Sequence, residues 1–295
     1  MHYVITGSLG NISHSIVTSL VAAGHSVKVI TSNNNRVAAI EALGASAAVG
    51  SVEDVAFLTD AFASADAVYT MVPPKWDAAD WKAHIHSVGK NYAAALKANN
   101  IKWVVNLSSI GADKSSGVGP VTGLHQVETS LNQLADVNIL HLRPGYFFSN
   151  FFGNIGMIKH MGIIGSNNEA GNSMVLSDTS DIAAAAAEAL LALDFKGHSV
   201  KYLASDERTP AEIAAVLGKA IGIPSLPWVS FSDEQNLAGM VQAGLTQEVA
   251  SNYTEMGASM RSGEMAEDFY KHRPAEFGKV KLEDFATVFA GAYQA

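Results

Sequence analysis

Residues 3–13 read YVITGSLGNIS, an apolar run that ends in a glycine-containing turn. An amphipathic pattern follows at once, with apolar residues at Ile16, Val17, Leu20 and Val21. This order predicts a strand, a tight turn and a helix at the start of the chain. Glycine lets the backbone bend sharply and approach a ligand closely, and the first turn of a helix presents free N–H groups and a positive dipole end that suit a phosphate.

The turn has the spacing G-x-x-G-x-x-S, formed by Gly7, Gly10 and Ser13. This is a variant of the dinucleotide-binding fingerprint, whose third position allows the helix to pack closely on the strand, and serine is small enough to serve there. An ordinary strand–helix turn can have these residues too, but the β–α–β pattern behind this turn favours nucleotide binding. The first acidic residue of the chain is Glu41, so no carboxylate opposes an anionic ligand in this unit.

Composition narrows the class of protein. The chain has 295 residues, 48% of them hydrophobic, which suffices for one large domain or a domain with a lobe. The net charge of −9 argues against a nucleic-acid surface, and the lack of cysteine excludes disulfides and thiol chemistry. No apolar run reaches the roughly 18 residues of a membrane span, and residues 1–6 resemble a core strand rather than a signal peptide. We therefore expect a cytoplasmic protein with no nucleic-acid or membrane partner.

Strand-like and helix-like segments alternate through the first half of the chain, which predicts a mostly parallel sheet. The expected strands after the first are residues 26–31, 45–49, 67–72, 103–107 and 137–142. The expected helices among them are residues 37–43, 55–62, 81–98 and 121–134. Strands buried on both faces are near-continuous apolar runs, as residues 67–72 and 103–107 are.

The second half has a looser pattern. Residues 146–177 combine five glycines with four phenylalanines, and we expect loops and a short helix over a pocket there. A helix capped by Asp178 or Asp181 should run to Leu193, and a strand at residues 199–203 should return to the sheet.

Further helices make the second half a lobe. Thr209-Pro210 starts one of them, with threonine as the N-cap and proline at the first helical position. Two more are expected at residues 232–243 and 246–262. The predicted fold class is α/β, with a doubly wound, mostly parallel Rossmann-type sheet and a smaller helix-rich C-terminal lobe.

Six segments of the chain contain distinctive sequence motifs. They are ITGxxGNI at residues 5–12, Pro73-Pro74, NLSS at residues 106–109, GPxxGLHxVE at residues 119–128, LRPGYF at residues 142–147 and SDxxDIA at residues 177–183. Together they resemble the NmrA-like family, a group of atypical short-chain dehydrogenase/reductase relatives. The resemblance covers most of the chain. It implies an NAD(P)-binding Rossmann domain over residues 1–148 and a C-terminal substrate lobe over residues 149–295.

Two functions follow from this resemblance. The family includes NAD(P)H-dependent quinone and isoflavone-type reductases, and also redox-sensing regulators that bind the dinucleotide without known turnover. The first expectation is therefore an NAD(P)H-dependent oxidoreductase that transfers a hydride to a quinone or a similar small carbonyl acceptor. The alternative is a non-catalytic NAD(P) redox sensor that regulates a protein partner.

The residues after the second strand bear on the choice of nucleotide. An acidic residue there would bond the ribose hydroxyls of NAD, but residues 31–36 read TSNNNR, without a carboxylate. Ser32, Asn33 and Arg36 can hold a 2′-phosphate, which favours NADP(H) over NAD(H). Alternatively, Arg36 is a solvated cation that contacts no ligand.

The resemblance also places Met71, Val72 and Pro73 beside the ribose and nicotinamide. The complete set of expected cofactor contacts is Thr6, Gly7, Leu9, Gly10, Asn11, Ile12, Ser32, Asn33, Arg36, Met71, Val72, Pro73, Ser108, Pro144 and Tyr146.

Catalysis is harder to assign. Short-chain dehydrogenases use Ser, Tyr and Lys, with the Tyr as proton donor or acceptor. Ser108 or Ser109 follows the fifth strand, but Pro120 and Leu124 take the Tyr and Lys positions, so the Y-x-x-x-K motif is absent. The missing Tyr and Lys favour the sensor. An aromatic pocket and the length of the lobe favour the enzyme.

Three candidate catalytic residues remain: Ser108, His125 and Tyr146. Histidine titrates near neutrality and can donate a proton to a reduced oxygen, although His125 can equally pack or bond a backbone carbonyl at the helix start. Glu128, one turn later, either orients that histidine or is a surface charge.

An apolar substrate pocket lined by aromatic side chains is also expected. Hydride transfer needs no protein acid if the product anion is stabilised, so a cofactor, an apolar lid and a few hydroxyls suffice. The candidate pocket residues besides Tyr146 are Trp76, His125, Phe147, Asn150 and Phe151, which can alternatively belong to the core. No metal site is expected, because His84 and His86 point to different helix faces.

Overall fold

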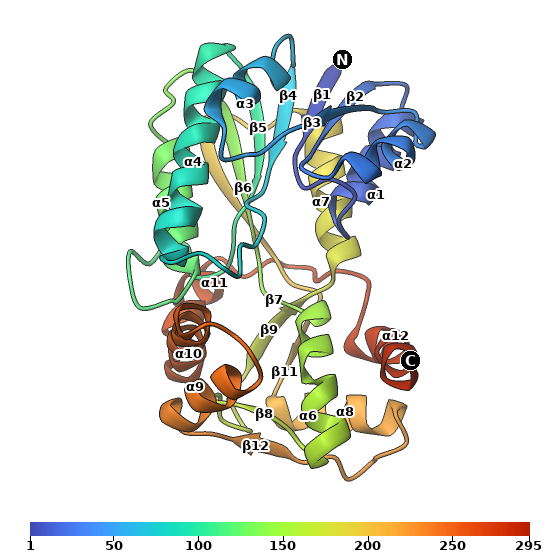
Figure 1. The fold of residues 1–295 in the computed structure, drawn as a ribbon, viewed down its shortest axis with the longest axis vertical. Coiled ribbons are helices and arrows are strands. Elements are labelled where there is room, and N and C mark those ends of the chain that lie inside the picture. Colours follow the sequence, from blue (N-terminus) through green and yellow to red (C-terminus); the bar gives the residue numbers. More distant parts are fainter.

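A seven-stranded sheet forms the centre of the protein in the computed structural model, which describes residues 1–295 (Figure 1). Its strands are β1 (His2–Ile5), β2 (Ser26–Thr31), β3 (Ser46–Val49), β4 (Ala67–Thr70), β5 (Trp103–Leu107), β6 (Asn138–Pro144) and β10 (His198–Leu203). Their order is β10-β6-β5-β4-β1-β2-β3, and every neighbouring pair is parallel. The predicted doubly wound α/β fold is confirmed.

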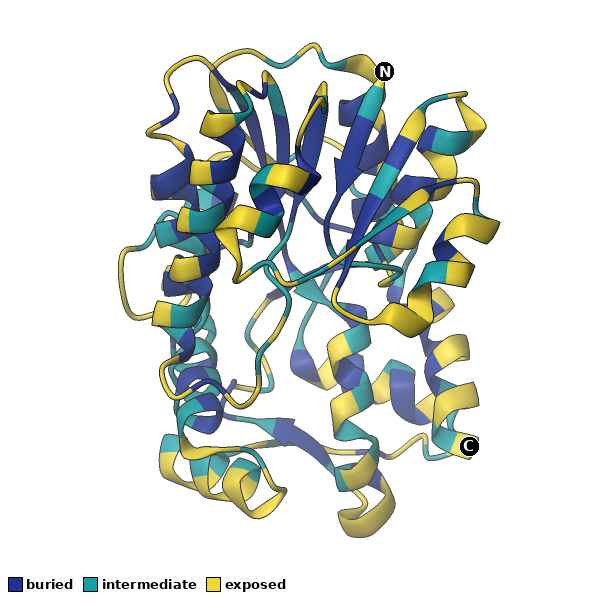
Figure 2. Ribbon diagram, turned by 45° about the horizontal axis from the view of Figure 1, so that its top comes forward, coloured by how far each residue is buried: buried dark blue, intermediate teal, exposed yellow.

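Helices cover both faces of this sheet. They are α1 (Ser13–Ala22), α2 (Val37–Ala42), α3 (Val55–Ala61), α4 (Trp81–Ala98), α5 (Val121–Leu131) and α7 (Thr179–Ala192). Tyr3 and Ile5 of β1 share a core with α1, α2 and α7, whereas Val4 shares the opposite core with α3, α4 and α5. Successive side chains of a strand point to opposite faces, so both faces are buried. Figure 2 shows the central strands as the most buried layer and the exposed residues on the outer sides of the helices.

The strand order reverses beside β1. The chain runs outward from β1 through β2 to β3, and β4 then lies on the other side of β1. The helices that follow these two neighbouring strands, α1 and α4, cover opposite faces. The connections therefore diverge at the carboxyl ends of β1 and β4, which is where ligands bind in open parallel sheets.

Side-chain caps set the starts of several helices where the sequence predicts them. Asp178 is the N-cap of α7, and its carboxylate accepts the backbone N–H of Ser180 at 2.8 Å. Asp181 has another role, because its carboxylate accepts the backbone N–H groups of Lys279 and Val280. It thus fastens a distant C-terminal segment to the start of α7.

The C-terminal lobe contains more strand than the sequence indicates. Residues 146–177, expected to be loops and a short helix, contain β7 (Tyr146–Phe147), the 3-10 helix η2 (Phe148–Asn154), α6 (Ile155–Met161), β8 (Ile164–Ser166) and β9 (Met174–Ser177). β9 pairs with β7 and with β11 (Asp206–Arg208), and β8 pairs with β12 (Trp228–Ser230). Such short strands depend on distant partners, which local periodicity does not reveal.

Helices surround these two small sheets (Figure 1). They are α8 (Pro210–Ala220), α9 (Asp233–Gln242), α10 (Gln247–Ser262), α11 (Glu267–Lys271) and α12 (Leu282–Gln294), and η1 (Asn34–Arg36) and η3 (Glu264–Ala266) are the remaining 3-10 turns. Phe148 of η2 stacks on Phe285 of α12, with ring centroids 5.5 Å apart, so the last helix closes the lobe's own core. None of the helices has the length and apolar character needed to cross a membrane.

A series of hydrogen-bonded polar side chains crosses the core between β4 and β6. Thr70 donates to Asn106 at 2.9 Å, and the Asn106 amide lies 3.1 Å from Nδ1 of His141. The other ring nitrogen of His141 lies 3.0 Å from Oδ1 of Asn132. Burial lowers the pKa of His141 to about 4, so this histidine is neutral at physiological pH.

Candidate functional site

The glycine loop after β1 requires glycine at its first position. Gly7 has a φ of +89°, and a Cβ there would lie 2.6 Å from Oγ of Ser13. Ser13 takes the third position of the fingerprint, and its hydroxyl donates to the carbonyl of Thr6 at 2.8 Å. The serine thus ties the start of α1 to the end of β1, which is the close packing that the motif demands.

The same loop presents unused hydrogen-bond donors. The backbone N–H groups of Leu9, Asn11, Ile12 and Ser13 donate to no other group of the protein. No acidic residue lies in the first turn of α1, and Asn11 is exposed. Together with the positive end of the helix dipole, these donors form a suitable site for a phosphate.

The end of β2 lies against this loop. The Ser8 backbone N–H donates to Ile30 at 3.0 Å, and the Ser8 hydroxyl donates to Thr31 at 3.0 Å. The next residues, Ser32 to Arg36, are exposed. No carboxylate lies within 4.0 Å of the Arg36 guanidinium, which leaves this cation free for a ligand.

The segment after β4 links the glycine loop to a cavity. The Met71 backbone N–H donates to the Thr6 hydroxyl at 2.9 Å, and the Met71 carbonyl accepts from Tyr92 at 2.7 Å. A Cβ on Gly7 would lie 3.0 Å from Cγ of Met71. Met71, which contacts the glycine loop, therefore also lines the cavity described next.

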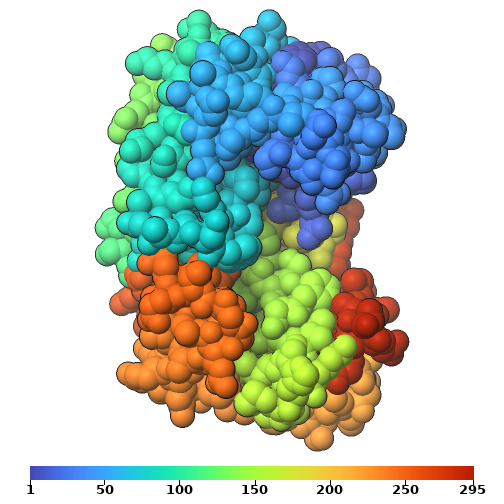
Figure 3. Space-filling model, in the orientation of Figure 1, coloured from blue at the N-terminus to red at the C-terminus, as the bar shows by residue number.

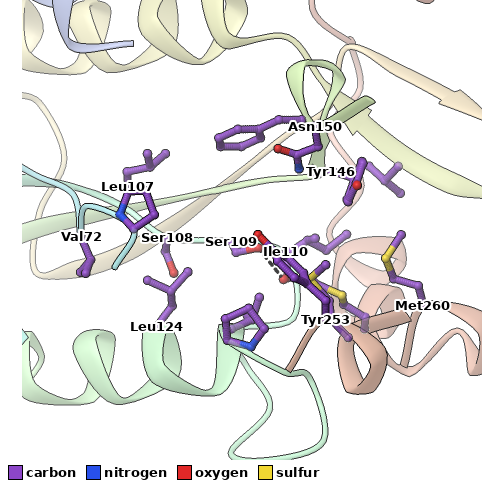
Figure 4. Close-up of a pocket in the computed structure, with 18 of the residues that line it drawn as sticks. Val72, Leu107, Ser108, Ser109, Ile110, Leu124, Tyr146, Asn150, Tyr253 and Met260 are labelled. Atoms are coloured by element: carbon purple, nitrogen blue, oxygen red, sulfur yellow. Dashed lines mark hydrogen bonds between the residues drawn. The ribbon is translucent and has the colours of Figure 1, made fainter. Parts of the chain in front are cut away.

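A cavity of about 320 Å³ lies at the carboxyl ends of β4 and β5, between the sheet and the lobe. Figure 4 shows side chains from the Ser108 loop, from β7 and from α10 converging on it. Figure 3 shows the surface hollowed between the blue N-terminal part and the green segment below it. The residues that line the cavity are Met71–Pro74, Trp81, Ile85, Leu107–Ile110, Pro120, Val121, Leu124, Gly145–Phe147, Asn150, Ser173–Val175, Tyr253, Met256, Met260, Met265 and Ala266.

The structure brings many of the expected residues together at this cavity. They are Met71, Val72, Pro73, Ser108, Tyr146, Phe147 and Asn150. The other expected cofactor contacts lie at the glycine loop and after β2, except Pro144. That proline ends β6, is buried, and offers its carbonyl to the backbone N–H of Ile110 at 2.9 Å.

Three expected pocket residues lie outside the cavity wall, which corrects their placement. Trp76 is 51% exposed and packs on Trp81, with ring centroids 5.3 Å apart, beside a separate surface hollow. Phe151 is only 2% exposed and belongs to the lobe core. His125 does not reach the cavity, and its Nδ1 lies 2.9 Å from the carbonyl of Ala112. His125 therefore bonds a backbone carbonyl instead of facing a substrate.

The interpretation of Glu128 as a surface charge is wrong. Glu128 is 4% exposed and accepts the hydroxyl proton of Ser108 at 2.5 Å. It also accepts from Nε of Arg143 at 3.0 Å and from Nη2 of the same guanidinium at 2.6 Å. A bidentate Arg–carboxylate pair therefore lies directly behind a residue of the cavity wall. The sequence separation of these residues gives no sign of the pair, because α5 and β6 meet only in the folded chain.

The Arg143 side chain continues this network toward the lobe. Its NH1 donates to the Tyr202 hydroxyl at 2.9 Å, and that hydroxyl donates to Asp268. Burial alone would lower the pKa of Arg143, but the hydrogen bond and charge of Glu128 raise it above its ordinary value. Arg143 is thus a permanent cation, and its charge is taken up by protein carboxylates.

Two tyrosines face the cavity. Burial raises the pKa of Tyr146 to about 12, although the neighbouring amide of Asn150 lowers it in part. Burial and the nearby Tyr146 raise the pKa of Tyr253 as well. Both phenols are therefore protonated at neutral pH and can act as hydrogen-bond donors. Tyr253 and the methionines of the lobe wall were missed by the sequence interpretation, because nothing local distinguishes a cavity wall from an ordinary apolar helix face.

The chain is similar to known proteins. The profile of the NmrA-like family matches residues 2–260. The chain is 24% identical over 257 residues to the NAD(P)H azoreductase of Xenophilus azovorans, and the match covers 86% of each chain.

The solved structures that share the fold include two reductases. One is a NADPH-dependent quinone oxidoreductase of Escherichia coli complexed with NADPH, with a TM-score of 0.76 and 20% identity over 97% of this chain and 99% of the other. The other is the Citrobacter sp. triphenylmethane reductase complexed with NADP(H), with a TM-score of 0.79 and 19% identity over 98% of this chain and 99% of the other. At these identities the likeness establishes the architecture.

Proposed function

The chain belongs to the NmrA-like family, and on that premise we propose that it is an NAD(P)H-dependent reductase of a quinone or a similar small carbonyl compound. The observation that carries the proposal is the apolar cavity of about 320 Å³, whose wall continues through Met71 to the glycine loop. An acceptor site thus adjoins a dinucleotide site. The names of the relatives reported above, an azoreductase, a quinone oxidoreductase and a triphenylmethane reductase, support the same class of reaction.

The residues after β1 and β2 fit a nicotinamide dinucleotide. The free N–H groups of Asn11 and Ile12 can bind a phosphate, and the lack of a Cβ on Gly7 keeps the loop open to a close approach. The dinucleotide supplies the hydride when bound. The unpaired Arg36 and the absence of a carboxylate after β2 favour NADP(H), since a guanidinium pairs with a 2′-phosphate.

Tyr146 is our candidate for the proton donor at the acceptor. Its raised pKa of about 12 keeps the hydroxyl protonated, and the side-chain amide of the neighbouring Asn150 can orient that hydroxyl. Ser108 has a different role. Its hydroxyl proton is directed to Glu128, so its oxygen faces the cavity as an acceptor that orients a ligand N–H or O–H. His125 is left out of this mechanism because its ring is bonded to Ala112.

The test measures NADPH oxidation by the purified protein with a panel of quinones, alongside NADPH binding. We expect oxidation that saturates with quinone. Tyr146→Phe should lower kcat by about 100-fold, the usual contribution of a general acid, without weakening NADPH binding. Tyr270→Phe is the matched control, because Tyr270 is 45% exposed and lies outside the cavity.

The possible outcomes separate the parts of the proposal. NADPH binding without oxidation by any acceptor would contradict the reductase and favour the redox-sensor alternative. Oxidation that Tyr146→Phe leaves intact would keep the reductase and remove Tyr146 as the proton donor.

A further inference from the structure

The wall of the cavity carries no charged side chain. Of its 25 lining residues, 17 are hydrophobic, and the polar side chains are hydroxyls and one amide. Five methionines belong to this wall: Met71, Met174, Met256, Met260 and Met265. Methionine is flexible and polarizable, and its sulfur makes favourable contacts with aromatic rings. The wall therefore suits a flat aromatic molecule and offers no charged partner to an anion.

The nearest buried cation is not available to a ligand. Arg143 lies behind Ser108, and each of its three side-chain nitrogens already donates to a protein oxygen. Two of these donors bind Glu128, which compensates the guanidinium charge. An anion in the cavity would therefore find no counter-charge there.

The lysines near the cavity are also paired. Lys75 binds Glu53 at 2.9 Å, Lys82 binds Glu255 at 2.5 Å, and Lys114 binds Glu267. Lys75 and Lys82 directly follow the lining residues Pro74 and Trp81. To serve a ligand, a lysine would first have to leave its carboxylate. The net charge of −9 further disfavours the approach of an anion.

Resting on the proposed reductase function, we infer that the acceptor is an aromatic compound without a negative charge and that the site rejects analogues with a sulfonate or carboxylate on the reacting ring. Such an anion would lose its hydration in the cavity without gaining a cationic partner. An uncharged quinone gives up apolar hydration and the hydrogen bonds of its carbonyl oxygens, which the Tyr146 hydroxyl can replace, and it gains contacts with Tyr146, Tyr253 and the methionines.

The experiment compares menadione with the naphthoquinone sulfonate that has a sulfonate in place of its methyl group. The sulfonate withdraws electrons and makes the ring intrinsically easier to reduce, so a preference for menadione cannot come from reactivity. We expect kcat/KM to be about 100-fold lower for the sulfonate, as an unpaired buried charge implies. Equal values, or a preference for the sulfonate, would overturn the inference.

A binding measurement keeps the inference testable without turnover. Trp81 lines the cavity, so an acceptor that enters should quench its fluorescence, and Trp81→Phe removes this signal as a control. If neither quinone oxidises NADPH, the proposed reductase fails. Quenching by menadione alone would still support the charge selection, whereas equal quenching by both or by neither would refute it.

A charge introduced at the rim gives the converse test. Asn150 lines the cavity and is exposed, so Asn150→Lys adds a cation without disturbing the core. This variant should reduce the preference for menadione by about tenfold, the effect of one new ion pair of partly shielded charges. Asn150→Gln is the neutral control: any change in how Tyr146 is held affects both quinones alike, so the ratio of their kcat/KM values should stay at that of the wild type. A ratio that is the same in both variants would show that charge does not decide the selection.

Discussion

The buried pair of Glu128 and Arg143 leads to the most specific stability prediction. Glu128→Leu removes a carboxylate that is 4% exposed and leaves the guanidinium of Arg143, 8% exposed, without its main partner. It also removes three hydrogen bonds, one from Ser108 and two from Arg143. Leucine fills a volume comparable to that of glutamate, so the loss of stability comes from the unpaired charge and not from an empty cavity.

Two routes give similar magnitudes for this loss. Removing one member of a buried ion pair costs about 3–5 kcal/mol, because the remaining charge is buried and uncompensated. Counted as hydrogen bonds to charged groups, at about 1.5 kcal/mol or more each, the three lost contacts give roughly 4.5 kcal/mol. We therefore expect the free energy of unfolding to fall by about 4 kcal/mol, a large part of a typical total of about 5–15 kcal/mol.

The double variant separates charge from packing. Arg143→Leu alone leaves Glu128 uncompensated and should cost a similar amount, but the combination of both substitutions leaves no unpaired charge in the pair. Its cost should be at least about 2 kcal/mol less than the sum of the single losses. The control is Glu188→Leu, which breaks an exposed ion pair with Lys201 at 3.6 Å and should cost less than about 1 kcal/mol.

Urea unfolding followed by tryptophan fluorescence and by circular dichroism supplies these free energies, provided that both probes give the same transition. A loss below about 1 kcal/mol for Glu128→Leu would refute the argument, because the pair would then behave like a surface ion pair. Strict additivity in the double variant would refute it as well, since the two charges would then not interact.

Four further predictions concern single residues. Gly7→Ala should weaken NADPH binding and cost about 1–3 kcal/mol of stability, measured by titration and urea unfolding, because it combines a φ of +89° with a 2.6 Å clash. Arg36→Ala should weaken NADPH binding by about tenfold and leave NADH binding unchanged; equal losses in the two titrations would speak against a 2′-phosphate contact. His125→Ala should keep kcat within about threefold of the wild type, because the ring does not line the cavity, and a loss like that of a general acid would contradict this. Burial lowers the pKa of His141 from 6.5 to about 4, so this histidine stays neutral in the folded chain while the unfolded chain takes up a proton. The free energy of unfolding should therefore fall by about 3 kcal/mol as the pH falls from 6.5 to 4. Urea unfolding at several pH values measures this slope, and His141→Asn should abolish it.

Elements with strong local signals were predictable. The helix at residues 81–98 was expected from its apolar spacing, and α4 spans Trp81–Ala98. Thr209-Pro210 marked the start of α8, where Thr209 forms a capping box with Glu212. Caps and periodicity act within a few residues of one another, so the sequence displays them directly.

Other features depended on distant partners and escaped prediction. β8 is three residues long and exists because β12, more than 60 residues later, pairs with it. The sequence also could not tell Asn150, which lines the cavity, from Phe151, which turns into the lobe core. Neighbouring side chains in a 3-10 segment point in different directions, and only the packing of the lobe decides which of them faces the cavity.

The sequence by itself determined the doubly wound sheet, the glycine loop at its switch point and the family resemblance, because each rests on local chemistry repeated along the chain. Only the tertiary structure decided the composition of the cavity. Glu128 looks like a surface charge on α5 and Arg143 like an isolated cation on β6, yet folding buries them together behind Ser108. The energy of a buried charge depends on what surrounds it in space, so the site's electrostatics arise only when separate elements meet.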